Sequence, residues 1–387
     1  MVQYSDRAKK LGKKMSQGFY QWVTDPKNRP VIFFYILTFM LIFGALRFYD
    51  YKSNLKGKND EDIEKLYGSG TQIGNMPITH KHGLRDYYIL GSYNSCCGGS
   101  ISNDFVSLVP LKEVIKQGAR VLDFELYSKG GRAIIAAAPD SEPNEKVMLK
   151  GSYNHIDLDP LFKTLEIYAF GAGLAPNPKD PLFLSFRIRT ENSNAIDQLA
   201  KKIKDVFGNR LLSSQLGNEG KYASKKSNMQ TVKIRDLWNK VVIMVSDPKN
   251  TYEGTNLAEL INLSDKMPNY RVLRNYDIVF GHDMSELTES NKKGITLTLP
   301  DAVSDDTNPK IILHQKYGCQ MCCSNFSVND TNHKFFLKKF QQAGTAFILK
   351  PYHLRYHETK IKPPKDQNVN VSYKERKEGT EVVDFKL

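Results

Sequence analysis

The cysteines are the residues of this 387-residue chain whose type and spacing most directly suggest chemistry. Cys319 and Cys322 form a Cys-x-x-Cys pair with Cys323 beside it, and Cys96 and Cys97 are adjacent. Thiolates at such spacings bind Zn²⁺ when four ligands converge. Free cysteine also occurs as a small buried apolar residue, and an odd number of cysteines leaves at least one thiol unpaired within the chain. The spacing alone leaves both interpretations open.

The histidines do not complete a recognisable catalytic group with these thiols or with a hydroxyl. His80 and His82 precede the first apolar run of the soluble part, and His353 and His357 flank Arg355. General acid–base catalysis requires an imidazole within hydrogen-bond reach of the reacting group. No nucleophile stands at a recognisable spacing from any of them, so we expect solvated or capping roles.

The elements that must position any site alternate between strand-like and helix-like patterns. Amphipathic stretches at 111–118, 159–170, 195–207 and 332–342 separate the apolar runs. The apolar runs of strand length are residues 87–90, 120–126, 133–138, 182–186, 241–245, 276–280, 319–323 and 346–350. Strands separated by helices indicate a parallel α/β arrangement, and about eight strands over some 275 residues predict a closed (β/α)₈ barrel.

A single membrane-spanning helix is predicted ahead of the barrel. No residue from Val31 to Leu46 is charged, and residues 31–49 would span roughly 28 Å as a helix. Tyr20 and Trp22 before this run would sit at one headgroup level, and Phe48, Tyr49 and Tyr51 after it at the other. Residues 1–30 carry seven basic and two acidic residues, which favours a cytoplasmic N-terminus and a type II signal-anchor topology.

The remaining organisation follows from composition. The basic segment 1–30 is either a short amphipathic helix on an anionic leaflet or a solvated tail. Residues 50–78 are polar and are predicted to form a stem or linker, and residues 79–355 are predicted to form the barrel domain. The tail 356–387 could form a β-hairpin around residues 377–379. Of the net charge of +13, +5 lies in the 30 residues ahead of the helix, so the excess chiefly indicates topology and leaflet contact rather than a nucleic-acid partner.

Two separated blocks of residues resemble the catalytic boxes of phosphoinositide-specific phospholipase C. Residues 317–326 read YGCQMCCSNF, where the C-terminal (Y) box of that family reads GCQMVALNF. Residues 343–351 read AGTAFILKP and are followed by Leu354 and Arg355, where the family has G-Y-V-L-K-P and then L-R. The family keeps the first cysteine of this box inside a strand, which favours the buried interpretation of the thiols.

The N-terminal (X) box is matched over about 85–212, and the Y box over about 232–355. LGSYN at 90–94 stands where the family has S-S-H-N, and GARVLDFE at 118–125 where it has G-C-R-x-x-E-x-D. PLFLSF at 181–186 stands where the family has P-x-x-L-S-x-E. Both boxes occur in family order and at family spacing. The resemblance implies a TIM barrel of the phospholipase C-like phosphodiesterase type, behind one N-terminal transmembrane helix.

The resemblance also implies which residues stand at the family's proton-transfer positions. The family cleaves a phosphodiester by attack of the inositol 2-hydroxyl and uses two histidines for acid–base work. The first histidine falls on Tyr93 and the second on Ala137. Alanine cannot transfer a proton, and a tyrosine of pKa about 10 is a poor substitute for imidazole. His155 is an alternative candidate to replace a lost catalytic group.

The resemblance also implies which residues stand at the family's calcium-binding positions. The asparagine beside the first histidine is kept as Asn94, and two strand carboxylates fall on Asp123 and Glu125. The last calcium carboxylate falls on Arg187. A guanidinium there would repel Ca²⁺ and offer both carboxylates an ion-pair partner. These positions are therefore expected to be vestigial and not to bind metal, with calcium expected only if the chain is active.

The phosphate-binding positions of the family are also replaced. Its two lysines fall on Met244 and Ser246, and its phosphate-reading arginine falls near Val303. Residues 305–308, DDTN, resemble the DSSN that follows in the family. Headgroup recognition is therefore expected to be degraded along with catalysis.

Together these replacements favour a membrane-anchored pseudo-phospholipase C, a pseudoenzyme that serves as a structural or adaptor protein. Its expected partners are the bilayer and other proteins of a larger assembly, such as a virion or an organelle membrane complex. One alternative is an active phosphoric diester hydrolase with a rearranged site. Another is a non-catalytic module in which Arg187 binds an anionic lipid headgroup.

Overall fold

The structure is a computed structural model in which the chain divides into two compact units, Met1–Arg355 and Tyr356–Leu387. The residues that it describes are 2–138, 151–171, 173–212, 229–301, 307–358, 377–379 and 384–386.

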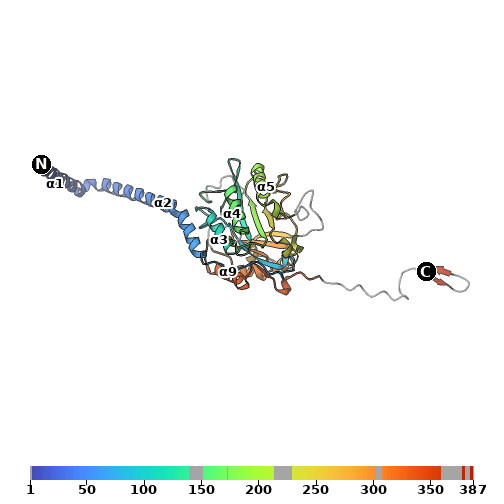
Figure 1. The fold of residues 1–387 in the computed structure, drawn as a ribbon. Coiled ribbons are helices and arrows are strands. Elements are labelled where there is room, and N and C mark those ends of the chain that lie inside the picture. Colours follow the sequence, from blue (N-terminus) through green and yellow to red (C-terminus); the bar gives the residue numbers. More distant parts are fainter. Residues whose placement is uncertain are drawn as a thin grey trace. The chain divides into compact units, whose positions relative to one another are not determined.

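Eight parallel strands curl into a nearly closed barrel that forms the centre of the first unit (Figure 1). Along the hydrogen-bonded path they are β7 (Leu263–Ser264), β6 (Val241–Ser246), β5 (Leu182–Ile188), β2 (Val121–Lys129), β1 (Tyr87–Ser92), β10 (Met321–Ser324), β9 (Ile295–Leu299) and β8 (Tyr270–Arg274). Most are buried along nearly their whole length, as expected for parallel strands with both faces covered. Within the described residues no ladder joins β7 to β8, so the seam of the barrel lies there.

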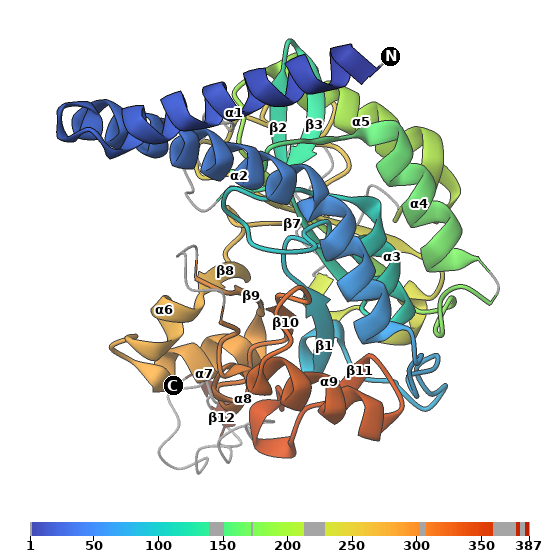
Figure 2. The ribbon, with the colours of Figure 1, turned by 90° about the vertical axis from the view of Figure 1, so that its left-hand side faces the viewer.

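Helices cover the outside of the barrel (Figure 2). They are α3 (Leu108–Lys116), α4 (Leu158–Phe170), α5 (Ser193–Phe207), α7 (Met284–Lys293), α8 (Ile311–Lys316) and α9 (Thr331–Ala343). Short 3-10 turns lie at Leu84–Asp86, Gly208–Arg210, Met229–Thr231, Ile234–Leu237 and Tyr352–Leu354. In α5, Asn192 accepts a hydrogen bond from the backbone of Ala195 at the N-terminus, and apolar residues at helical spacing are buried. The predicted α/β barrel is confirmed.

Two of the predicted strands exist but lie outside the parallel barrel. Residues 133–138 overlap β3 (Arg132–Ala136), which pairs antiparallel with β2 and in turn with β4 (Ile156–Asp157). Residues 346–350 overlap β11 (Phe347–Leu349), which pairs antiparallel with β1. The barrel strands β7, β8 and β9 were not predicted, because they are short or carry polar residues at alternate positions.

The prediction of a strand at 276–280 is wrong, because this segment begins helix α6 (Asn275–Val279). The carboxylate of Asp277 accepts a hydrogen bond from the backbone nitrogen of Arg274 at 2.7 Å, which satisfies one of the free donors at a helix start. Asp301 accepts another from the backbone nitrogen of Tyr276 at 2.7 Å. These local caps outweigh the β-propensity of the aromatic and β-branched residues.

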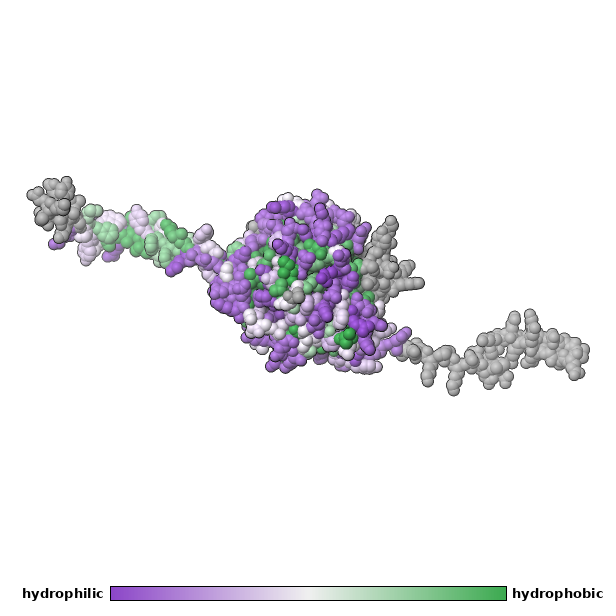
Figure 3. All heavy atoms as spheres, viewed as in Figure 1, coloured by the Kyte–Doolittle hydropathy of each residue, from purple (hydrophilic) through white to green (hydrophobic). Residues whose placement is uncertain are grey.

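The N-terminal segment is helical. Helix α1 (Val2–Thr24) is followed by a 3-10 turn, Pro26–Asn28, and by α2 (Arg29–Tyr67), and the stretch Pro26–Tyr67 is long and apolar enough to cross a membrane by its length and composition. Figure 3 shows the hydrophobic run of α2 between more polar flanks. Phe33, Phe34 and Phe39 are each more than 60% exposed, so no described part of the protein covers this run.

Helix α2 continues past residue 49, where the sequence placed the end of the span, and packs against the barrel. Leu55, Ile63 and Tyr67 are buried, and α2 lies against α3 (Figure 2). The Tyr67 hydroxyl donates to the carbonyl of Phe326 at 2.7 Å and lies 2.8 Å from His333 Nε2. The segment expected to be a polar stem is thus largely a helix whose apolar face is buried on the barrel.

The second unit carries a short antiparallel pair of strands, β12 (Lys377–Gly379) and β13 (Asp384–Lys386). The segment 377–379, around which the sequence suggested a turn, forms one of the two strands.

Candidate functional site

Two carboxylates and one guanidinium face one another inside the barrel, toward the carboxyl ends of the strands. Asp123 and Glu125 are two residues apart on β2, so their side chains lie on the same face. The parallel register places Ser185 opposite Asp123 and Arg187 opposite Glu125 on β5. Asn94 follows β1 in the left-handed region at φ 41°, which asparagine tolerates better than most residues.

The guanidinium of Arg187 lies among the oxygen atoms of the three neighbouring residues. Its Nε donates to Asp123 Oδ1 at 3.0 Å, and its Nη2 donates to Asp123 Oδ2 at 2.7 Å. Nη2 also donates to Asn94 Oδ1 at 2.6 Å, and Nη1 is ion-paired with Glu125 Oε1. All three guanidinium nitrogens are therefore engaged, and the ion pairs expected from the sequence are present.

This cluster is almost completely removed from solvent. The side chain of Arg187 is 2% exposed, and those of Asp123 and Glu125 are 0% and 1% exposed. Burial alone would lower the pKa of Arg187, but the two carboxylates raise it well above its ordinary value. Arg187 is therefore permanently charged, and neither carboxylate is left with an uncompensated buried charge.

Tyr93, at the position of the family's first histidine, contacts two guanidinium groups. The carbon of the Arg187 guanidinium lies 4.8 Å from the ring centroid, and that of Arg274 lies 5.5 Å from it. Arg274 Nη1 donates to the Tyr93 hydroxyl at 3.2 Å and to the carbonyl of Pro300 at 2.8 Å. The hydroxyl oxygen of Tyr93 thus accepts a hydrogen bond from a cationic side chain.

Ala137, at the position of the second histidine, is buried directly after β3. Its carbonyl accepts from the backbone nitrogen of Ser152 and its nitrogen donates to the Ser152 hydroxyl, while the backbone nitrogen of the next residue, Ala138, donates to Glu125 Oε2 at 3.1 Å. The Tyr127 hydroxyl donates to the same oxygen at 2.6 Å. Both oxygens of Glu125 therefore have partners, and the methyl group of Ala137 brings no transferable proton near them.

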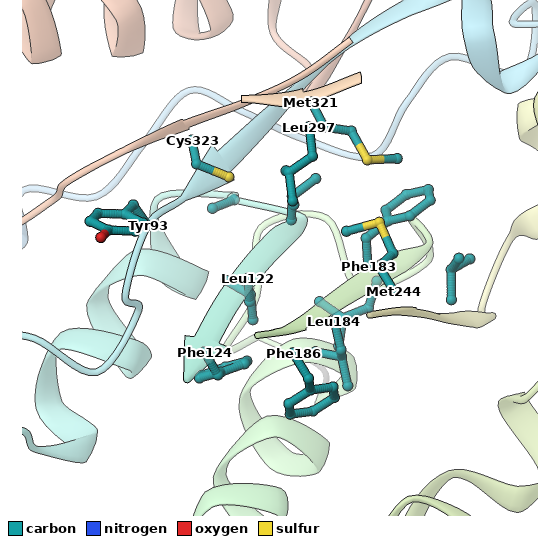
Figure 4. Close-up of a cluster of buried hydrophobic side chains, with 14 of the residues drawn as sticks. Tyr93, Leu122, Phe124, Phe183, Leu184, Phe186, Met244, Leu297, Met321 and Cys323 are labelled. Carbon is teal, nitrogen blue, oxygen red and sulfur yellow. The ribbon is translucent and has the colours of Figure 1, made fainter. Parts of the chain in front are cut away.

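The replaced phosphate-binding positions lie on β6. Met244 is fully buried among apolar core side chains (Figure 4), and the Tyr270 hydroxyl donates toward its sulfur at 3.9 Å. Ser246 donates to Asp265 Oδ2 at 3.0 Å. Val303 lies outside the described residues. The described part of the barrel thus presents no cation at the two lysine positions.

The other candidate groups do not join this cluster. His155 forms no hydrogen bond or ion pair with Asp123, Glu125 or Arg187 within the described residues. The alternative in which Arg187 binds a headgroup loses support, because its donors are already engaged.

All five cysteines are free and buried. Burial raises the pKa of each of these thiols, so they remain protonated and act as packed apolar side chains. Cys323 packs against Gly91 of β1, where an added Cβ would lie 2.7 Å from its sulfur. Across the described ranges, no group of three or more His, Cys, Asp or Glu side chains could hold a metal ion.

Three residues of the site were missed by sequence reasoning. Tyr127 lies two residues after Glu125 on the same face of β2, so strand alternation could have found it. Ser185 donates to Asp123 Oδ1 at 3.3 Å, and its register opposite Asp123 becomes visible only when β2 and β5 are paired. Arg274 ends β8, a strand that the apolar pattern did not reveal.

The residues present do not fit a calcium ion. Ca²⁺ requires six to eight oxygen ligands at about 2.3–2.6 Å. Asn94, Asp123 and Glu125 are the oxygen donors at the corresponding positions, and each of them is bonded to the cationic side chain of Arg187. A divalent ion would have to displace a buried guanidinium and tolerate its charge nearby.

No family model and no curated protein matches the sequence. Among solved structures, PLC21 of L. pealei and PLC21 of S. officinalis each match with a TM-score of 0.58 and 17% sequence identity. The matches cover 73% and 74% of this chain and 39% of each of those chains, so this chain spans about two fifths of their length. The chain has the fold of phospholipase C-like phosphodiesterases.

Proposed function

We propose that this chain is a catalytically inactive phospholipase C-like barrel, held at a membrane by its N-terminal helix, that serves as a structural or adaptor protein in a membrane-associated assembly. The observation that carries the proposal is the position of the Arg187 guanidinium, which bonds Asp123, Glu125 and Asn94 simultaneously. These are the residues that the resemblance assigns to calcium. The cation that the family binds is thus replaced by a side chain of the protein itself.

The size of the rate contribution that the replaced catalytic groups would supply supports an inactive barrel over a rearranged enzyme. A positioned acid or base contributes typically 10²- to 10⁴-fold to a rate, and a catalytic metal contributes several kcal/mol of charge stabilisation. This chain has Tyr93 and Ala137 at the two histidine positions and a guanidinium among the calcium ligands. Among the described residues, no histidine is hydrogen-bonded to Asp123 or Glu125.

Membrane anchoring is proposed from the exposure of the apolar run of α2. A run of exposed large apolar side chains without a protein cover is costly in water and favourable in a bilayer. The basic residues ahead of the run would place the N-terminus in the cytoplasm, with α1 on an anionic leaflet. Protein partners in a virion or organelle membrane complex would then contact the barrel.

Calorimetric titration of the full chain with Ca²⁺ tests the replacement of metal by Arg187. We expect no binding up to millimolar concentrations, because the oxygen ligands are engaged by the guanidinium. Arg187→Glu restores a carboxylate at this position, and we expect it to gain a calcium-dependent rise in melting temperature.

Asp123→Asn is the matched control, because it removes one of the carboxylates that calcium would need. Binding of Ca²⁺ by the unmodified chain that disappears in Asp123→Asn would contradict the proposed replacement.

A further inference from the structure

An apolar groove lies on the outside of the barrel between α8 and α9, away from the buried cluster. The two helices lie side by side (Figure 2), and the groove between them has a volume of about 260 Å³. Ile311 and Phe336 are buried, whereas Ile312 and Phe335 are 58% and 56% exposed. Two bulky apolar side chains at the edges of one hollow form a surface that water solvates poorly.

Positive charge predominates on the two helices that form this groove, and Asp330 is the N-cap of α9. Helices α8 and α9, with the residue that precedes α8, contain five lysines and no aspartate or glutamate. These lysines are Lys310, Lys316, Lys334, Lys338 and Lys339. None of them is ion-paired within the part of the chain that the structure describes. Two of them, Lys310 and Lys339, line the apolar hollow, so its walls carry positive charge.

The shape of the groove favours a helix over a small molecule. Its volume is below the roughly 300 Å³ at which small-molecule pockets begin. Its lining on α9 extends from Thr331 to Lys339, about 12 Å along the helix axis. A bound helix that inserts side chains at i, i+4 and i+7 covers a similar length, about 10 Å.

The distribution of charge distinguishes a peptide from a lipid. A lipid presents its charge at one end of an apolar chain, whereas an amphipathic helix presents charges along both sides of its apolar stripe. Each wall of this groove carries a lysine, Lys310 on the α8 side and Lys339 on the α9 side. Lys339 is held in place by a hydrogen bond to Gln315 of α8.

We infer that this groove, lined by Ile311, Ile312, Phe335 and Phe336 and by Lys310 and Lys339, binds an acidic amphipathic helix of a protein partner. The apolar stripe of that helix would fill the hollow, and its carboxylates would face the lysines. Such a surface would serve the adaptor role proposed above. Its test is separate from that role, because peptide binding is measured whether or not the barrel hydrolyses a lipid.

The probe is a fluorescein-labelled synthetic helix of about four turns, with leucines at i, i+4 and i+7 and glutamates on both flanks. Its binding to the full chain in zwitterionic-lipid nanodiscs is followed by fluorescence anisotropy. We expect saturable binding that Ile312→Glu and Phe335→Glu each weaken at least tenfold. Lys310→Glu is expected to weaken binding and to reduce its dependence on salt.

The controls distinguish binding in the groove from nonspecific hydrophobic binding and from loss of folding. Ile167→Glu changes a 42% exposed isoleucine on α4 and should leave binding unchanged. Each variant must keep the melting temperature of the unmodified chain.

Three outcomes would overturn the inference: no binding of the acidic peptide, equal binding of the same peptide with lysine in place of glutamate, or unchanged binding in Ile312→Glu. Competition by phosphatidylserine vesicles that requires Ile312 and Lys310 would assign the groove to lipid instead.

Discussion

Replacing Arg187 by methionine is expected to lower the free energy of unfolding by about 3–5 kcal/mol, because it leaves Asp123 and Glu125 buried without a counter-charge. Methionine keeps much of the volume of the arginine stem, so the change reports mainly on charge. Chemical denaturation of the full chain, monitored by far-ultraviolet circular dichroism of the barrel, measures the loss.

Arg271→Met is the matched control, since Arg271 forms an ion pair with Glu286 in which both side chains are well exposed. An exposed pair contributes about 0–1 kcal/mol, so this variant should unfold nearly as the unmodified chain does. The triple variant Arg187→Met, Asp123→Asn, Glu125→Gln should recover a large part of the lost stability, because no buried charge remains. Equal losses in Arg187→Met and Arg271→Met would show that the buried cluster is not held by charge.

Acidification from pH 6.5 to 4 is expected to destabilise the barrel through two buried histidines. Burial lowers the pKa of His314 and of His333 to about 4, with Asp301 and Asp330 respectively opposing the shift. Above pH 6.5 both residues are neutral whether the chain is folded or unfolded. Below pH 6.5 these histidines bind protons in the unfolded chain but stay neutral in the folded chain. Each histidine can therefore lower the free energy of unfolding by up to about 3 kcal/mol as the pH approaches 4.

A second buried group titrates in the same pH range, because burial raises the pKa of Asp180 to about 6, and its effect on stability has the opposite sign. The variant His333→Gln is therefore needed to separate the histidine from this carboxyl. A raised carboxyl pKa means that the folded chain gains stability as the pH falls below 6. The difference in stability between the unmodified chain and His333→Gln isolates the histidine. That difference should change by about 3 kcal/mol between pH 7 and 4, and a constant difference would show that His333 is not neutral when buried.

His333 also explains why α2 is joined firmly to the barrel. Its Nε2 lies 2.8 Å from the hydroxyl of Tyr67, the last residue of α2, and its Nδ1 lies 2.8 Å from Ser324 Oγ at the end of β10. Protonation would place a positive charge at this buried junction, and burial disfavours the charged form of the imidazole. The acid-induced loss of stability should therefore begin where α2 meets the barrel.

Much of the fold could be predicted because its core strands are long and apolar and its helices are amphipathic. The apolar run 182–186 is uninterrupted, which predicts a central parallel strand, and the structure shows that it is buried on both faces. The prediction failed where a short polar interaction decided the structure, as at Asp277, whose carboxylate caps a helix inside a β-prone segment. The continuation of α2 to Tyr67 was missed because its buried face holds few apolar residues among many charges.

The candidate site could be predicted only as far as the resemblance carried it. The positions of Asp123, Glu125 and Arg187 came from matching motifs, and strand pairing then brought them together in the barrel. The resemblance assigned Tyr93 to a histidine position, but its contact with Arg274 could not be predicted, because Arg274 comes from a strand 181 residues away. Contacts between distant strands depend on register, which local sequence patterns do not encode.

Hydrolysis of phosphatidylinositol by the full chain in nanodiscs, with and without Ca²⁺, tests the central claim most directly. We predict no release of inositol phosphate above that of Glu125→Gln, because Arg187 fills the position that the resemblance assigns to calcium, and the two positions that it assigns to histidines hold tyrosine and alanine. Hydrolysis by the unmodified chain that disappears in Asn94→Ala would contradict this account.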